Sequence, residues 1–564
     1  MFEAANRLGD MRGDLIGSMC AVTGKTVVEG DVEVSEGIDY ARFYTTTMKK
    51  FAALHDVDIT SKGTILVISP WNFPCAIPIG GIVAGLAGGN TVILKPATVA
   101  APVAWLFAKA FWDAGVPKEA LQVIITDREA LKELTTAPAI KHIILTGGTD
   151  TAQSIARTNP STPLSAETGG KNAIILTASG DRDHAIMNIV TSAFGNAGQK
   201  CSACSLLLVE RSVYEDKNFQ DKLKDAATSI KVGSVWEAGN VVGPMITNRN
   251  DKLLQALTLE PGESWLVPPK FIDEKQYILA PTVKWGVKPG SYSFRTELFG
   301  PMLSVACIDN LQQGIELVNS LDYGLTSGLQ SLDENEQKLW KDSILAGNLY
   351  INRGITGAIV NRQPFGGMKL SAFGGGVKAG GPNYCACLVK ITDKPESNTD
   401  YKQSYPHAYE EEFAHARDIN KLYGEQNAFR YLPLKNMVLR LFPGDSNEEA
   451  EMIALATKLC HTPLTISFDP NDDRTTALSS TGCTLKKETL DEFLKTMRSY
   501  ERIRTCGADI PMEMYEEAAR RNKYIATAKP VKNGRVELIH YIKEQSISFE
   551  FHRYGSILDV PPVE

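Results

Sequence analysis

Short apolar runs alternate with amphipathic segments in the first part of the chain. Short runs rich in branched residues predict buried strands, and apolar positions that recur three and four residues apart predict helices. The predicted strands lie at 64–68, 90–94, 121–126 and 142–146, and the predicted helices at 1–50, 79–87, 103–111 and 129–135. This alternation predicts a doubly wound parallel sheet, which binds ligands beyond the carboxyl ends of its strands.

The same alternation returns twice further along the chain. Strands at 173–176 and 205–209, with a helix between them, predict a second α/β layer. A third α/β unit begins with a strand at 437–441. A helix follows it, and the capping-box sequence that starts at Ser446 marks the beginning of this helix. The unit continues with a strand at 464–468 and ends in alternating apolar and polar residues at 547–552, which predict a half-buried strand. We therefore predict an α/β fold divided into residues 1–166, 167–395 and 426–564, with a linker at 396–425.

The composition excludes few classes of protein. At 564 residues, with 43% hydrophobic and 22% charged residues, the chain should hold two or three domains with substantial cores. A net charge of −7 gives no reason to expect nucleic acid or an anionic membrane as a partner. Ten cysteines without framework spacing indicate reduced thiols and predict a cytoplasmic protein.

One uncharged stretch, from Lys62 to Lys95, is long enough to span a bilayer. It contains Pro70, Pro74 and Pro78, which interrupt any continuous helix. We interpret it as a buried strand, a loop and a core helix.

Cys201 and Glu167 are the strongest candidates for chemistry. A cysteine acts as a nucleophile in its thiolate form, and the position of Cys201 after a helix and beside Lys200 predicts that the thiolate is favoured. Glu167 precedes paired glycines, as expected of a water-activating carboxylate at a strand end. Two alternatives are a core cysteine and, because Cys204 completes a Cys-x-x-Cys, half of a zinc site or a redox pair.

Five motifs occur in an order that resembles the aldehyde dehydrogenase superfamily from about residue 5 to residue 390. They are Pro70-Trp71-Asn72-Phe73-Pro74, Leu94-Lys95-Pro96-Ala97, Glu167-Thr168-Gly169-Gly170, Gly198-Gln199-Lys200-Cys201 and Glu297-Leu298-Phe299-Gly300-Pro301. Residues 356–360, 363–367 and 378–382 are similar to the branch of bifunctional proline-utilisation enzymes that oxidises L-glutamate γ-semialdehyde. The resemblance implies a doubly wound NAD-binding domain at 1–166 and an α/β catalytic domain with the substrate loop at 167–395. It also implies a non-catalytic, degenerate Rossmann-like domain at 426–564.

The resemblance also implies roles for individual residues. Cys201 would attack the aldehyde, Asn72 would bind the oxyanion and Glu167 would activate water to hydrolyse the thioester. NAD is the implied cofactor, although a lysine at its ribose also tolerates the phosphate of NADP; no metal is implied. The implied cofactor-binding residues are Lys95, Gly147, Gly148, Glu297 and Phe299, and the implied substrate-binding residues are Phe73, Ser202, Gly357, Ala358 and Phe365.

Members of this family normally carry a further segment at the N-terminus that includes early strands of the cofactor domain, so we expect a chain that starts inside that domain and is N-terminally truncated. The expected partners are a small amino-acid aldehyde, a proline dehydrogenase domain or protein, and further copies of this chain. Residues 426–564 lack the catalytic motifs and are expected to serve in assembly or as a lid. Two other functions stay open: a dehydrogenase of other substrate range or CoA-acylating type, and an inactive scaffold.

Overall fold

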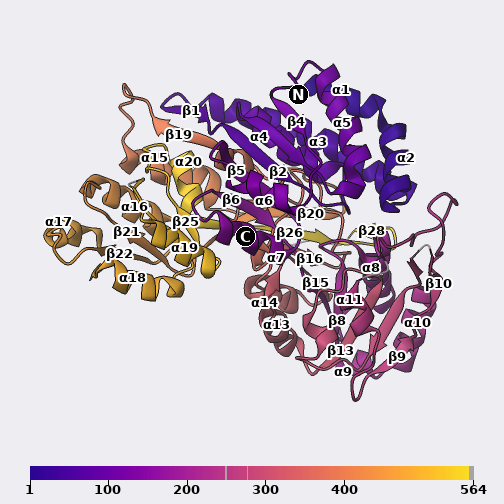
Figure 1. Cartoon of the computed structure of the whole chain (residues 1–564). Coiled ribbons are helices and arrows are strands. Elements are labelled where there is room, and N and C mark those ends of the chain that lie inside the picture. The colour runs from indigo at the N-terminus through magenta and orange to yellow at the C-terminus, as the bar shows by residue number, and fades with distance from the viewer. Residues whose placement is uncertain (248–249, 276, 508, 558–564) are drawn as a thin grey trace.

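The structure, a computed structural model, describes residues 1–247, 250–275, 277–507 and 509–557. It contains three large sheets, which lie at the top, lower right and left of Figure 1. The α/β fold predicted from the sequence is confirmed. No described helix is long and apolar enough to cross a membrane.

The first sheet has the strand order of a doubly wound fold. Its strands, in spatial order, are β18 (Ala372–Phe373), β6 (Leu164–Glu167), β5 (Ile140–Thr146), β2 (Thr64–Ile68), β3 (Thr91–Lys95) and β4 (Leu121–Val123). All but β18 are parallel, and the order reverses between β2 and β5, where such sheets bind ligands. The helices of this part are α1 (Phe2–Asp10), α2 (Arg12–Thr23), α3 (Val27–Ala52), α4 (Ala76–Ala87), α5 (Ala101–Asp113), α6 (Arg128–Thr136) and α7 (Thr149–Thr158).

Helix α4 begins three residues before the predicted start because a remote carboxylate caps it. Glu33, on α3, accepts hydrogen bonds from the backbone N–H groups of Cys75 (2.7 Å) and Ala76 (3.1 Å). Its other oxygen lies 3.0 Å from the Lys25 ammonium, and both side chains are buried. A carboxylate at a helix N-terminus satisfies free N–H groups and complements the helix dipole.

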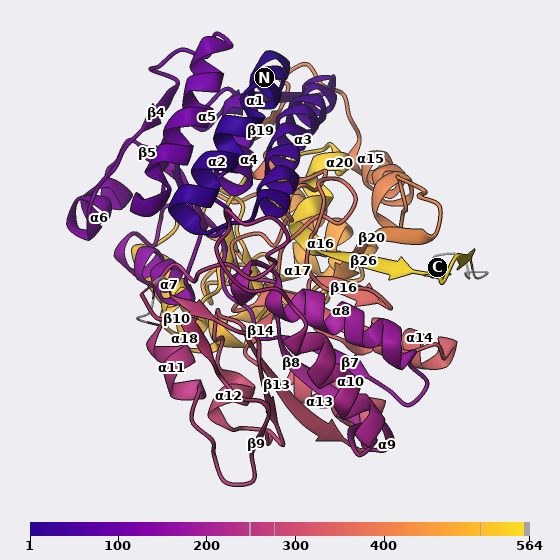
Figure 2. The same ribbon diagram turned by 90° about the vertical axis from the view of Figure 1, so that its right-hand side faces the viewer.

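The second sheet contains nine strands and includes two from the C-terminal part of the chain. In spatial order they are β20 (Glu425–Pro433), β26 (Ile542–Glu550), β16 (Asn348–Ile351), β15 (Thr326–Gln330), β7 (Asn172–Leu176), β8 (Cys204–Glu210), β13 (Met302–Ile308), β12 (Thr282–Trp285) and β9 (Ser264–Val267). Its helices include α8 (Arg182–Phe194), α10 (Lys217–Thr228), α11 (Asp251–Ala256), α13 (Leu311–Asn319) and α14 (Glu334–Ser343). Figure 2 shows β26 and β20 beside β16.

Strand β26 starts earlier than predicted and is not half-buried. The polar side chains of Ser546 and Ser548 are as buried as the apolar side chain of Ile547. The strand pairs with β16 on one side and β20 on the other, so its polar residues face other parts of the protein instead of solvent. Residues on both sides of the predicted linker therefore belong to one sheet.

The third sheet confirms the Rossmann-like prediction for the C-terminal part. Its parallel strands are β23 (Thr484–Lys487), β22 (Leu464–Phe468), β21 (Met437–Arg440), β24 (Arg502–Arg504) and β25 (Tyr524–Ala526). Its main helices are α16 (Asn447–Leu459), α18 (Leu490–Thr496) and α19 (Met512–Arg520), and the predicted capping box opens α16. The segment before it, predicted as a linker, forms α15 (Tyr401–Ala408), whose Tyr405 is fully buried.

Candidate active site

The candidate catalytic residues meet where the first two sheets face each other. Asn72 follows β2 and Glu167 ends β6, so both lie at the carboxyl edge of the first sheet. Cys201 lies just before β8, at the amino edge of the second sheet. Asn172, the first residue of β7 in the second sheet, holds the loop that carries the cysteine, because its side-chain amide donates to the carbonyl oxygens of Cys201 (2.6 Å) and Ala203 (3.0 Å).

Two glycines permit the loops of the site to approach closely. A Cβ on Gly169 would lie 2.2 Å from a carboxylate oxygen of Glu297, and a Cβ on Gly198 would lie 2.2 Å from the carbonyl oxygen of Gly300. At Gly198 the clash is with backbone and φ is positive at 68°, so a residue with a Cβ does not fit there. At Gly169 a Cβ would force the Glu297 side chain to move. The motifs that contain Glu167, Cys201 and Glu297 are therefore packed into one site.

Asn72 is buried and its amide is directed at the loop that carries the cysteine. One N–H of its side chain donates to the carbonyl oxygen of Gln199 at 3.0 Å. A side-chain amide has two N–H donors, so a second remains for a ligand. This arrangement suits the proposed oxyanion contact.

The structure contradicts the prediction that Lys200 favours the thiolate of Cys201. The Lys200 ammonium pairs with Glu29 at 2.8 Å. Burial and, to a lesser extent, the nearby carboxylates of Glu167 and Glu297 raise the pKa of the Cys201 thiol to about 12. The thiol is therefore protonated at neutral pH, and its proton needs an acceptor when the sulfur attacks.

Glu167 has the properties of a general base near neutral pH. Burial raises the pKa of its carboxyl group to about 7, although the Lys378 ammonium and the Ala379 backbone N–H lower it. The Lys378 ammonium is itself held by Asn348 Oδ1 (2.9 Å), and its backbone N–H donates to Glu544 at 2.6 Å. Lys378 opens the motif at 378–382, but the sequence predicts no role for it and none for Glu544, because nothing local to either residue indicates a neighbour so distant in sequence.

The residues implied for NAD lie at the carboxyl edge of the first sheet or face it. Lys95 ends β3, Gly147 follows β5, and Gly148 caps α7, whose N-terminal N–H groups suit a phosphate. Glu297 accepts a hydrogen bond from Gly170 N–H at 2.8 Å, and Phe299 packs edge-on against Trp71. Within the described residues the Lys95 ammonium has no hydrogen-bonding partner, which leaves it available for ribose hydroxyls. The residues present therefore fit a dinucleotide.

The residues implied for the substrate come from three segments. The Lys25 ammonium lies 3.9 Å from the centre of the Phe73 ring, and Ser202 is buried beside Thr326, whose hydroxyl donates to its carbonyl oxygen. Within the described residues, the backbone N–H groups of Gly357 and Ala358 make no hydrogen bond, and Gly357 has a positive φ of 81°. Free N–H groups in such a loop can bind a carboxylate.

The last of these residues, Phe365, lies close to the general base. Its backbone N–H and carbonyl oxygen are paired with those of Ala379, the residue whose N–H faces Glu167.

The metal and redox alternatives for Cys201 and Cys204 gain no support. All ten cysteines are free, and Cys204 is buried with its thiol directed at Leu206 O (3.4 Å). In the described parts of the chain, the group of metal-ligand types that lies close together is Asp445, Glu449 and Cys506, in the third sheet.

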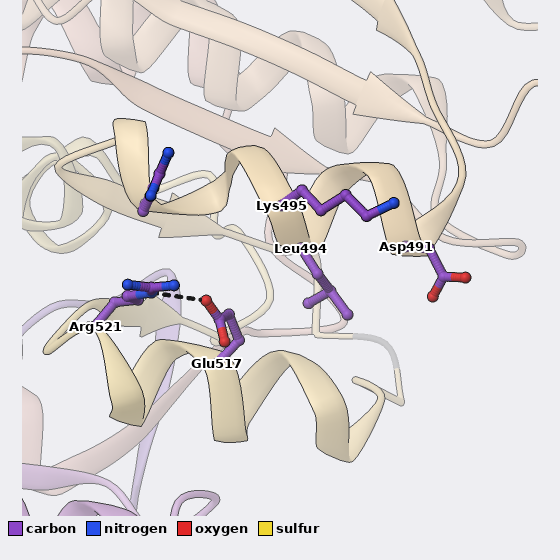
Figure 3. A pocket seen from close by; sticks show the side chains of 6 residues that line it. Asp491, Leu494, Lys495, Glu517 and Arg521 are labelled. Atoms are coloured by element: carbon purple, nitrogen blue, oxygen red, sulfur yellow. Dashed lines mark hydrogen bonds and ion pairs between the residues drawn. The ribbon is translucent and has the colours of Figure 1, made fainter.

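A surface groove between α18 and α19 lies in the third-sheet region, away from the catalytic residues (Figure 3). Arg521 pairs with Glu517 at 2.9 Å on one side of the groove, and Asp491 and Lys495, on α18, line the other side. These charged side chains at the surface provide no nucleophile or buried base.

The sequence profile of the Aldehyde dehydrogenase family matches residues 1–392, and the chain belongs to this family. A 1-pyrroline-5-carboxylate dehydrogenase of Geobacillus sp. (strain WCH70) is 33% identical over 407 residues, which cover 68% of this chain and 78% of that protein. The structure of Proline Utilization A (PutA) from Corynebacterium freiburgense is 38% identical with a TM-score of 0.87, and covers 99% of this chain. This chain spans 57% of the length of that PutA. The structure of a 1-pyrroline-5-carboxylate dehydrogenase from Thermus with bound NAD is 31% identical, with a TM-score of 0.65. The match covers 69% of this chain and 79% of the Thermus chain.

Proposed function

We propose that this protein oxidises L-glutamate γ-semialdehyde to L-glutamate with NAD, through a thiohemiacetal and a thioester on Cys201. The observation that carries the proposal is the convergence of Cys201, Glu167 and Asn72 at the junction of the first two sheets. The similarity to 1-pyrroline-5-carboxylate dehydrogenases supports the substrate, because this pyrroline is the cyclised form of the semialdehyde.

Cys201 performs the first step. Its sulfur attacks the aldehyde carbon, the carbonyl oxygen becomes an oxyanion, and the thiol proton passes to a base. Two acceptors are available: Glu167, which interacts with the thiol and has a pKa near neutrality, and water. The division of labour proposed here leaves the first step to Cys201 without requiring Glu167. The oxyanion would be held by the Asn72 amide and the Cys201 backbone N–H.

Lys95, Glu297 and Phe299 would hold NAD, which, when bound, supplies the hydride acceptor that converts the thiohemiacetal into a thioester. Glu167 then takes a proton from water, the hydroxide adds to the thioester carbon, and the Cys201 thiolate leaves with formation of a carboxylic acid. The protein's own contributions are therefore a nucleophile, an oxyanion site and a base.

Replacing Asn72 with alanine is expected to lower kcat by about 10²–10³-fold, the usual cost of losing one oxyanion donor. The KM for NAD should stay within about twofold, because Asn72 contacts the cysteine loop at Gln199 and not the proposed cofactor residues. Steady-state NADH formation measures both constants. An unchanged kcat would remove Asn72 from the oxyanion site.

The steady-state rate is expected to rise with pH through a pKa of about 7. Burial raises the pKa of Glu167 into this range, and only its deprotonated form accepts a proton from water. The measurement is a pH–kcat profile, with Lys378→Met as a second variant. Removing this cation should move the inflection to higher pH, since the ammonium lowers the pKa of Glu167. A profile that is flat between pH values well below and above 7 would contradict the assignment of Glu167.

The proposed function is tested by measuring NADH formation by the full chain in three parallel assays. The first contains L-glutamate γ-semialdehyde, the second an aliphatic aldehyde, and the third either aldehyde together with CoA. We expect the semialdehyde to be preferred and L-glutamate to form without CoA. Activity that depends on CoA would indicate an acylating enzyme. No NADH with any aldehyde, from a chain that binds NAD, would favour the scaffold alternative.

We also propose that the semialdehyde reaches this protein from a proline dehydrogenase, on another domain or chain. This rests on the likeness to PutA proteins. The expected homo-oligomer and cytoplasmic location are proposals as well; light scattering of the purified chain tests the first, and the ten free cysteines support the second.

A further inference from the structure

The loop that contains Gly357 and Ala358 is fastened at both ends by one carboxylate. Glu425, the first residue of β20, lies 2.7 Å from the guanidinium of Arg353 and 3.4 Å from that of Arg362. These two arginines bracket residues 354–361. The free backbone N–H groups of Gly357 and Ala358 lie between them.

The environment makes these ion pairs stronger than ordinary surface pairs. Relative exposure is 19% for the Glu425 side chain, 18% for Arg353 and 31% for Arg362. Salt and water screen charges at such positions less than they screen fully exposed ones. Arg353 also donates to the hydroxyl of Ser548 at 2.5 Å, so the clamp includes β26.

Further hydrogen bonds join the same loop to the C-terminal part of the chain. The side chain of Gln363 donates to Asn427 Oδ1 at 2.5 Å, and the hydroxyl of Ser546 donates to the carbonyl oxygen of Pro364 at 2.6 Å. Asn420 donates to the carbonyl oxygen of Asn361 at 3.2 Å. The end of the loop is therefore built on strands β20 and β26 and the segment before them.

Gly357 and Ala358 have few contacts of their own, although Ile355 before them is fully buried in the core. Ile355 N–H donates to the hydroxyl of Ser192, on the helix that leads to Cys201, at 3.0 Å. A side chain on Gly357 would meet nothing within 4 Å. The conformation of Gly357 and Ala358 therefore depends on how the flanking residues are held.

We propose that Glu425 is a positioning residue that sets this loop for aldehydes carrying an α-carboxylate, and so determines substrate selectivity. The inference rests on the proposed function, in which Gly357 and Ala358 bind that carboxylate. Glu425 neutralises one of the two arginine charges and fixes the ends of the loop, which keeps both N–H groups directed at one anion. The reacting groups, Cys201, Glu167 and Asn72, lie outside this contact network.

The test compares Glu425→Gln with the unchanged full chain on L-glutamate γ-semialdehyde and on pentanal, which lacks the carboxylate. We expect KM for the semialdehyde to rise roughly tenfold, the usual scale for losing one hydrogen bond to a charged group, with kcat within about twofold. The kcat/KM for pentanal should stay within about twofold. Glu412→Gln is the matched control, because Glu412 pairs with Arg417 and Arg535 in the same part of the chain and does not contact the loop.

Equal losses for both aldehydes, or an unchanged ratio between them, would overturn the proposal. If Glu425→Gln does not fold, Arg362→Gln removes the other partner of the Glu425–Arg362 ion pair. We expect the same loss of preference for the semialdehyde over pentanal. An unmodified chain that does not oxidise the semialdehyde refutes the proposed function; one that does, with selectivity unaltered in both variants, refutes only the role of Glu425.

Discussion

Cys201→Ala is expected to abolish NADH formation, with a loss of about 10⁴-fold or more, as when other enzymes lose the nucleophile of a covalent mechanism. The alanine variant should still bind NAD, because the proposed cofactor residues lie on other segments. Calorimetry with NAD therefore shows whether the site remains folded.

Cys204→Ala is the matched control for this experiment. Cys204 is buried three residues further on, at the start of β8, and its thiol faces a backbone carbonyl. We expect the activity of Cys204→Ala to stay within about twofold of that of the unchanged chain, because removing one buried sulfur atom affects stability and not the reacting groups. Loss of activity in Cys204→Ala with retention in Cys201→Ala would reverse the assignment of the nucleophile.

Glu167→Gln is expected to separate acylation from hydrolysis. Glutamine keeps the size of the side chain but cannot accept a proton from water. Attack by Cys201 and loss of hydride should still occur once per site, so rapid mixing should give a burst of NADH close to one equivalent. The steady-state rate should then fall by about 10²–10⁴-fold, the contribution of a positioned base.

The raised pKa of the Cys201 thiol adds an alternative outcome to this experiment. If Glu167 is also the essential acceptor of the thiol proton, burst and steady state should fall together in Glu167→Gln, and no acyl-enzyme should accumulate. Raising the pH should then restore the burst, since the thiol ionises without help at high pH. Full steady-state activity in this variant would remove the hydrolytic role of Glu167.

Much of the fold could be predicted from the sequence because strands buried on both faces appear as short apolar runs. The runs at 64–68 and 464–468 coincide with β2 and β22. The polar residues of β26 obscured its burial, because a serine facing an arginine inside the protein looks like a solvent-facing serine in the sequence. Only the pairing with β16 and β20, remote in sequence, shows where that strand lies.

The candidate catalytic residues could be located in the sequence because each lies in a recognisable motif, but their environments could not be predicted. Lys200 seemed to activate Cys201 from its adjacent position, yet its ammonium is paired with Glu29, on α3. Likewise, Lys378 and Glu425 contact charged partners that folding brings together from distant parts of the chain. Local sequence reports which groups are present, whereas their charge states depend on burial and on such partners.

The most direct test of the account is the intact mass of Glu167→Gln after mixing with NAD and L-glutamate γ-semialdehyde, followed by peptide mapping. The account predicts one γ-glutamyl group per chain, bound to Cys201 and absent when NAD is left out. An adduct on another cysteine, or on Cys201 without NAD, would contradict it, and so would an unmodified chain that has released a full equivalent of NADH.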